Sequence, residues 1–428
     1  MSRREAAIAW TRFGYGARPG DLDEVAHDPR GWLLAQLEDS RTPTELRGLR
    51  STEGAARDLA MGRGDREERR EMKSAVREQA FAEVAARARA AAESSAPFRE
   101  RWVAHFSNHF TVGRKNQVVT ALAGAYEREA IRPHALGRFA DLLLATARHP
   151  AMLVYLDQAG SVGPRSRAGM RRDRGLNENY ARELLELHTL GVDGGYDQGD
   201  VRELARLLTG WTVDRDTGRF IFRLQAHEPG SKTVLGTRYG EGETSGRRAL
   251  RDLADHPATA RHVARRLATH FLADQPNQAS IDALARTFTR SSGDLRAVAR
   301  TLIGLEEAWT APTKVKTPWD FVVHALRLTP MTQDRSILRA LKDFEQLPFT
   351  ADSPEGWSDQ AADWIGGDAL LARITWCEAA GRALRDTDAL ALGEGILGPL
   401  LSRDTRRAMS RSSTPHAVLL ASPDFQRR

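Results

Sequence analysis

The sequence of 428 residues has a single cysteine and no long apolar run. Cys377 is its one cysteine, which excludes an internal disulfide and a multi-cysteine zinc or iron–sulfur site. No apolar run approaches the roughly 18 residues of a membrane-spanning helix, and the mean hydropathy is −0.48. With 41% hydrophobic and 28% charged residues, the chain can still bury a sizeable core. The composition therefore predicts an ordered protein with no membrane span.

Lysine is also scarce, because six of the 63 basic residues are lysines and the others are arginines. The formal net charge is +6, but basic and acidic residues alternate, as in the stretch 63–73 (RGDREERREMK). Alternation of this kind suits ion-paired helix faces better than a basic groove. We therefore expect no nucleic-acid partner.

The sequence begins with Ser2-Arg3-Arg4, which is how a twin-arginine export signal starts. The apolar stretch that follows ends at Trp10, and a signal needs about 7–15 apolar residues and a cleavage site. We therefore expect a cytoplasmic protein.

Helical patterns dominate the chain and predict an all-α fold. A long helix is expected over 65–93, since no proline or glycine follows Gly64 there, and others over 98–110 and 177–190. Residues 212–238 contain β-favouring runs around an Asp-Thr-Gly turn, which predicts a small inserted antiparallel β-ribbon. The fold class is thus a large multi-helix domain with one ribbon.

We expect the whole chain, 1–428, to form a single helical unit. An alternative divides it into an N-terminal half, 1–157, and a C-terminal half, 177–428, joined by a flexible loop of glycines and arginines over 158–176. The 65–93 helix offers a surface for a protein partner or for homo-oligomer formation.

Two histidines on one predicted helix, His105 and His109, are candidate metal ligands. Residues at i and i+4 lie on one helix face with Cβ atoms about 5–6 Å apart, so both imidazoles can reach one ion. Without an intervening glutamate, this is not the H-E-x-x-H protease motif. The alternative is that both are core histidines bonded to backbone carbonyls.

The stretch 177–188 (NENYARELLELH) places Arg182, Glu183 and Glu186 on one polar helix face. The two glutamates are candidate carboxylate ligands or a general acid–base pair. Ordinary i, i+4 ion pairs between Arg182 and its neighbours are the competing explanation. His188 ends the stretch and is a further candidate ligand.

A predicted turn carries a third polar group, since His227, Glu228 and Lys232 fall within six residues. His227 is a candidate catalytic residue, although a solvent-exposed polar turn is the default explanation of the pattern. Cys377 lies in an apolar helix and is expected to be an inert core residue. The sequence has no phosphate-binding glycine loop, nucleophile elbow or dinucleotide fingerprint.

The run 177–192 (NENYARELLELHTLGV) resembles the hallmark of the bacterial "domain of unknown function 1800" family. Further segments that fit the same family are 12–17 (RFGYGA), 102–109, 232–236 (KTVLG), 314–318 (KVKTP), 354–357 (PEGW) and 370–373. The resemblance covers most of the chain. It implies no established activity, and many members of the family are exported and accompany a sulfatase-like or phosphatase-like protein.

The sequence supports two hypotheses about function. The first is a metal-assisted enzyme, redox or hydrolytic, with its site between helices 98–110 and 177–190. Its ligands would be His105, His109, Glu183 and His188 with a divalent metal (Fe, Mn or Zn), and Glu183, Glu186, Arg182 and His227 would serve catalysis. The second is a non-catalytic scaffold or partner-binding protein, in which the same residues form a structural ion-pair network. The substrate is unknown in either case.

Overall fold

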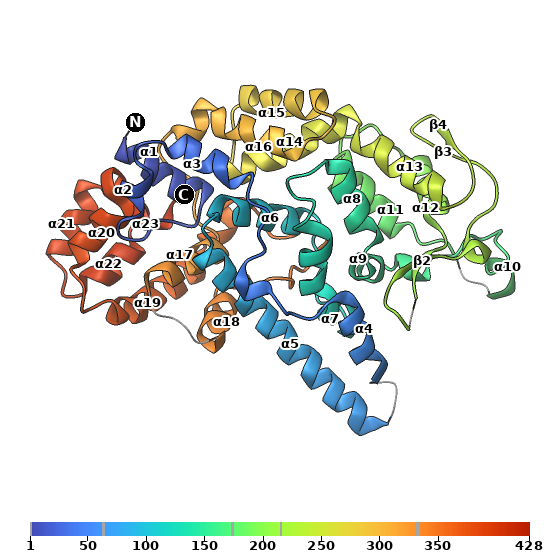
Figure 1. The fold of residues 1–428 in the computed structure, drawn as a ribbon, viewed down its shortest axis with the longest axis horizontal. Helices are drawn as coiled ribbons and strands as arrows, with labels where there is room; N and C mark the ends of the chain where they lie inside the picture. The colour runs from blue at the N-terminus through green and yellow to red at the C-terminus, as the bar shows by residue number, and fades with distance from the viewer. Residues whose placement is uncertain (1, 62–64, 173–174, 215, 330–333) are drawn as a thin grey trace.

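The computed structural model describes residues 2–61, 65–172, 175–214, 216–329 and 334–428. Within them most residues lie in helices, and Figure 1 shows these helices in an elongated arrangement. The all-α fold class is therefore confirmed. The helices of the first half are α1 (Arg3–Ile8), α2 (Asp21–Val25), α3 (Pro29–Gln36), α4 (Thr52–Met61), α5 (Arg66–Glu93), α6 (Pro97–His109), α7 (Gln117–Tyr126), α8 (Phe139–Arg148), α9 (Pro150–Tyr155), α10 (Gly169–Arg172), α11 (Asn179–Glu183) and α12 (Gln198–Leu208).

The second half of the chain continues in helices that return to the N-terminal region. Helix α1 contacts the 3-10 turn η9 (Gly398–Leu400), and α2 contacts α20. The helices are α13 (Glu243–Ala254), α14 (Pro257–Phe271), α15 (Gln278–Arg290), α16 (Leu295–Gly304), α17 (Pro318–Leu328), α18 (Asp334–Asp343), α19 (Gly367–Ala383), α20 (Ala389–Leu397), α21 (Arg403–Ser410), α22 (Pro415–Ala421) and α23 (Pro423–Gln426).

The predicted β-structure is present as two short antiparallel ribbons. Strand β1 (Trp211–Val213) pairs with β2 (Phe220–Phe222), and β3 (Lys232–Val234) pairs with β4 (Thr237–Tyr239). Residue 215, in the first turn, lies outside the described residues. Both ribbons lie at the end of the molecule opposite α19–α23 (Figure 1).

Three helices end in π-helical turns, where the backbone hydrogen bonds span one residue more than in an α-helix. These turns are η1 (Ala9–Phe13) after α1, η3 (Glu127–Ile131) after α7 and η5 (Leu184–Thr189) after α11. The helix expected over 177–190 is the α11–η5 segment. π-Helical turns occur often at functional sites, and η5 carries His188.

The long helix predicted over 65–93 is α5, and Asp65 caps it through a reciprocal bond with Glu68. Its second half is largely buried, from Val76 to Ala92. Its first half is exposed and charged, and it projects from the body beside α4 (Figure 1). The expected partner surface on this helix stays a prediction.

The main hydrophobic core draws on residues from both sides of the predicted 158–176 loop. It extends from Ile8 to Trp309, and a second core joins Tyr15 and part of α5 to helices between Trp319 and Phe425. Within 158–176 the structure shows a 3-10 turn, η4 (Gln158–Gly160), and α10, whereas residues 173 and 174 lie outside the described ones. Residues of both predicted halves therefore contribute to the main core, and the division of the chain into domains stays a prediction. No helix in the described part of the chain is long and apolar enough to cross a lipid bilayer.

The N-terminal cap of helix α12 gives a testable prediction about stability. Asp197 accepts a bond from the Asp200 backbone N–H at 3.0 Å, and the Asp200 carboxylate accepts one from the Asp197 N–H at 3.1 Å. We expect Asp197→Ala to lower the free energy of unfolding by about 1 kcal/mol, because it leaves the Asp200 N–H without its acceptor. Chemical denaturation measures this. Asp193→Ala, an exposed aspartate outside any helix cap, should change it by less than about 0.5 kcal/mol.

Candidate metal centre

Helix α6 carries His105 and His109 into the core, where each side chain is about 2% exposed. The two rings lie on one helix face, 6.4 Å apart between centroids, as their spacing predicts. Their neighbours differ. The ring of His105 lies 4.9 Å from that of His270, near the end of α14, whereas the ring of His109 lies 5.8 Å from that of His262, two turns earlier on α14. The two histidines therefore belong to different clusters.

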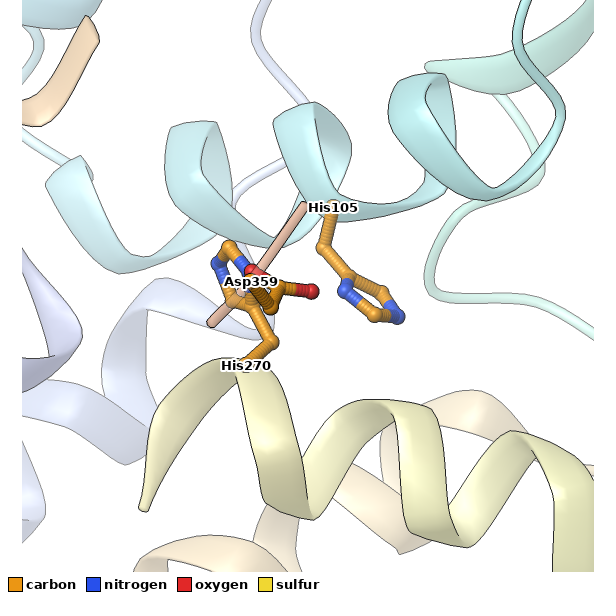
Figure 2. Close-up of side chains that lie close together, drawn as sticks. All are labelled: His105, His270 and Asp359. Atoms are coloured by element: carbon orange, nitrogen blue, oxygen red, sulfur yellow. The ribbon is translucent and has the colours of Figure 1, made fainter. Parts of the chain in front are cut away.

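The first cluster consists of His105, His270 and Asp359. Each residue offers one donor atom, and these atoms lie within 4.8 Å of one another, which no other group of three or more histidine, cysteine or acidic residues achieves in the described part of the chain. Figure 2 shows the His105 side chain extending from α6 and the His270 side chain from α14, with Asp359 overlapping His270 in this view. The three residues come from segments far apart in the sequence.

The hydrogen bonds in this cluster leave two imidazole nitrogens available to bind a metal ion. The Nδ1–H of His270 donates to Oδ1 of Asp359 at 2.7 Å. The Nε2 atoms of His105 and His270 are buried and have no hydrogen-bond partner among the described residues. Two imidazoles and one carboxylate are a ligand set that zinc, iron and manganese accept, with further positions left open.

Burial also sets the protonation states in the cluster. It lowers the pKa of His270 to about 4 and that of His105 well below the usual value. For Asp359, burial raises the pKa, but His270 and Arg266 reverse this, and the pKa is lowered overall. At neutral pH the imidazoles are thus neutral and the carboxylate is ionised, which are the forms that bind metals.

His270 and Asp359 line a cavity of about 70 Å³. That volume holds several water molecules. Tyr15 and Arg101 lie on its wall with Asp320. The cluster therefore has a partly open space beside it in which a small molecule fits.

Behind the cavity, Asp320 is held between two buried arginines. Its Oδ1 lies 3.0 Å from Nη1 of Arg101, and its Oδ2 lies 2.9 Å from Nε of Arg428. Arg428 also approaches Asp359, at 3.9 Å from Oδ1, and Nζ of Lys314 donates to the Asp359 carbonyl at 2.6 Å. Charged side chains thus fix the loop that carries Asp359 against α6 and α17.

Of the four ligands predicted from sequence, only His105 belongs to this cluster. The Nε2–H of His109 donates to the His188 carbonyl at 3.2 Å, and the two rings are 6.4 Å apart. Burial lowers the pKa of His188 to about 3. His105, His109, Glu183 and His188 do not meet within 4.8 Å, so the structure does not bring this predicted set together.

The predicted carboxylate pair lies on the outer face of the α11–η5 helix. Glu186 accepts a bond from the Tyr196 hydroxyl at 3.4 Å, and Arg182 pairs with Glu178 at 3.6 Å. Partial burial, followed by the charge of Glu186, raises the pKa of Glu183. None of Arg182, Glu183 and Glu186 lines the cavity beside Asp359.

His227 is buried between the end of α12 and the second ribbon. Its Nδ1–H donates to the Thr209 carbonyl at 2.9 Å, and its Nε2 accepts from the Gly242 backbone N–H at 3.0 Å. Both ring nitrogens are therefore used within the fold, and the residue is not an exposed turn histidine. Cys377 is fully buried, as expected, and burial raises its pKa to about 12.

Sequence reasoning missed His270 and Asp359. His270 is one of several histidines on arginine-rich α14, and Asp359 lies in a loop with no metal-ligand spacing around it. A signal was nevertheless present. The segments 12–17, 102–109, 314–318 and 354–357, on which the family resemblance rests, all contribute residues to the cavity or to its ion pairs.

The fold and the cluster together define an all-α protein with a buried histidine–carboxylate group beside a small cavity. Residues 8–427 match the model of the family described as "Protein of unknown function (DUF1800)", and the chain belongs to this family. The resemblance noted in the sequence is thereby confirmed. No curated protein and no solved structure matches the chain.

Proposed function

We propose that the protein is a metal-dependent enzyme whose divalent ion (Fe, Mn or Zn) is held by His105, His270 and Asp359. The observation that carries this proposal is the approach of three donor atoms within 4.8 Å, with two buried imidazole nitrogens that have no partner among the described residues. Buried polar atoms without a partner are costly, and an ion would satisfy them.

The ligand set determines which chemistry is available. A single divalent ion with three protein ligands supplies Lewis acidity or one-electron chemistry. The chain's own residues do the rest: α6 and α14 hold the two imidazoles in place, and the cavity limits the water near the open positions. Both hydrolysis and redox catalysis fit this arrangement.

In this proposal the other sequence candidates have supporting roles. The bond from His109 to the His188 carbonyl holds α6 against η5, and Arg182, Glu183 and Glu186 form part of the outer helix surface. The cytoplasmic location and the partner surface on α5 remain predictions from the sequence.

A structural role is the second candidate, and one observation favours it. Asp359 is already bonded to His270 and approached by Arg428, so the cluster also works as a polar clamp between the 351–360 loop and the core. In that case the residues would form the ion-pair network of a non-catalytic scaffold, and no ion would be needed.

Metal content separates the two candidates. After stripping with chelator and reloading with Zn²⁺, Mn²⁺ or Fe²⁺, we expect one ion per wild-type chain by elemental analysis. His270→Ala and Asp359→Asn should reduce metal affinity at least tenfold. Glu183→Gln and His27→Ala, a change at an exposed histidine, should retain the ion.

Two outcomes would contradict the proposal. Wild-type protein that takes up none of the three ions would favour the scaffold. Loss of the ion in Glu183→Gln with retention in His270→Ala would favour the set predicted from sequence. Circular dichroism of each variant shows whether the helices are intact.

A further inference from the structure

The cavity beside the proposed centre has a buried arginine in its wall. Arg101 is 1% exposed and lines the cavity. Its Nε donates to the Gly14 carbonyl at 2.8 Å, and its guanidinium lies over the Tyr15 ring, 4.6 Å from the ring centroid. Nη2 of Arg101 is buried and has no hydrogen-bond partner among the described residues. This leaves one strong donor without an acceptor at the cavity.

A second donor lies next to it. The Tyr15 hydroxyl accepts a bond from Nε1 of Trp319 at 3.2 Å. Its own hydrogen is used in no hydrogen bond that the described residues make, and the side chain is 1% exposed. Both groups line the same cavity as His270 and Asp359, so they would face a ligand held there.

The charges around the cavity also favour an anionic ligand. Arg101 and Arg428 are offset by Asp320 and Asp359, and Arg87, which also lines the cavity, is offset by Glu127, so these groups are close to neutral by themselves. A divalent ion would add two positive charges that nothing in the wall offsets. Burying a charge without a partner is unfavourable, and an anion in the cavity would remove most of that cost.

The size and the remaining walls limit the ligand. About 70 Å³ admits a molecule of a few heavy atoms around the charged group, and the rings of Trp319, Trp357 and Phe349 provide an apolar side. We propose that the cavity binds a small oxyanion, the carboxylate or phosphate group of the substrate, between Arg101, the Tyr15 hydroxyl and the metal ion. This inference rests on the proposed function, because it takes the ion as one of the three contacts.

Calorimetric titration of the metal-loaded protein tests the inference. Acetate and inorganic phosphate are the two anionic probes, and acetamide is the uncharged match for acetate. We expect at least one anion to bind at least tenfold more tightly than acetamide. The preferred anion then tells whether the group recognised is a carboxylate or a phosphate.

Variants assign the binding to the cavity. Arg101→Met should weaken the anion at least tenfold and Tyr15→Phe about threefold, each with one metal ion per chain retained. Arg385→Met, at an arginine that is 79% exposed, should have no effect. Arg101→Met also removes an ion pair. If Arg101→Met does not fold, Tyr15→Phe still tests the inference.

The outcomes distinguish this inference from the metal proposal. Metal binding with no preference for either anion over acetamide would overturn the inference and leave the metal centre intact. If the protein takes up no metal, the same titration on the metal-free protein decides. If the metal-free wild type binds an anion and Arg101→Met does not, the oxyanion site is supported. If the metal-free wild type binds neither anion, the inference is overturned.

Discussion

Asp320→Asn is expected to lower the free energy of unfolding by about 3–5 kcal/mol, since it leaves two buried arginines without their counterion. Asp320 is 3% exposed, and each of its carboxylate oxygens contacts a different arginine, Arg101 at 3.0 Å and Arg428 at 2.9 Å. Asparagine has nearly the same shape but no charge. Denaturant unfolding of the two proteins at neutral pH measures the loss.

An exposed ion pair is the matched control. Asp343 faces Arg339 one turn away on α18, at 3.5 Å, with side chains 55% and 84% exposed. Solvent screens such pairs, so Asp343→Asn should cost less than about 0.5 kcal/mol. Equal losses in the two variants would show that Asp320 is no more important than a surface charge.

The same carboxylate should make stability depend on pH. Burial raises the pKa of Asp320, but Arg101 and Arg428 outweigh it, and the pKa is lowered to about 2. A carboxyl group whose pKa is lower in the folded state stabilises the fold above its unfolded pKa, about 3.9, and this contribution is lost as the pH falls toward the folded value. The difference between wild type and Asp320→Asn should therefore shrink between pH 4 and pH 2.

Local signals in the sequence were sufficient to predict one of the helices that carry the site. The expected helix 98–110 is α6, and the spacing of His105 and His109 correctly placed both on one buried face. Absence of proline and glycine likewise placed α5 within one residue of its bounds. Such local signals depend on neighbouring residues alone, which is why they can be read from one sequence.

The partners of those residues could not be predicted in the same way. A helical pattern shows which face is buried but not which helix lies opposite it. His105 meets His270 of α14 and a loop aspartate, whereas His109 meets the η5 turn, although both occupy one face. The sequence predicted carboxylate ligands on the polar face of 177–188. In the structure Arg182, Glu183 and Glu186 are partly exposed, Arg182 pairs with Glu178, and Glu186 accepts a bond from Tyr196.

Gly16 offers the second large effect, because its backbone and its surroundings both exclude a side chain. Its φ is +93°, where L-residues other than glycine are strained. A Cβ there would lie 2.2 Å from Nε2 of His324. That ring is fully buried, stacks on Phe425 at 4.3 Å between centroids, and accepts a bond from Nζ of Lys316 at 2.6 Å, so it has little freedom to move.

Gly16→Ala is therefore expected to destabilise the fold by about 2–5 kcal/mol, through about 1–2 kcal/mol of backbone strain and about 1–3 kcal/mol of overpacking. Thermal and denaturant unfolding measure the total. Gly20→Ala separates the two causes, since Gly20 has a φ of +99° but no atom within 4 Å of the place that an alanine methyl group would occupy. It should show the backbone part alone.

Removing the ring that causes the clash provides the decisive comparison. If steric conflict with His324 dominates, the double variant Gly16→Ala/His324→Ala should lose less free energy of unfolding than the two single variants lose in sum. The difference should be about 1–3 kcal/mol. Strict additivity would contradict the clash and leave backbone strain as the cause. Tyr15, beside Gly16, contacts Arg101 and Trp319 at the cavity, so the clash would also disturb the proposed oxyanion site. Anion affinity should accordingly fall in Gly16→Ala and stay unchanged in Gly20→Ala.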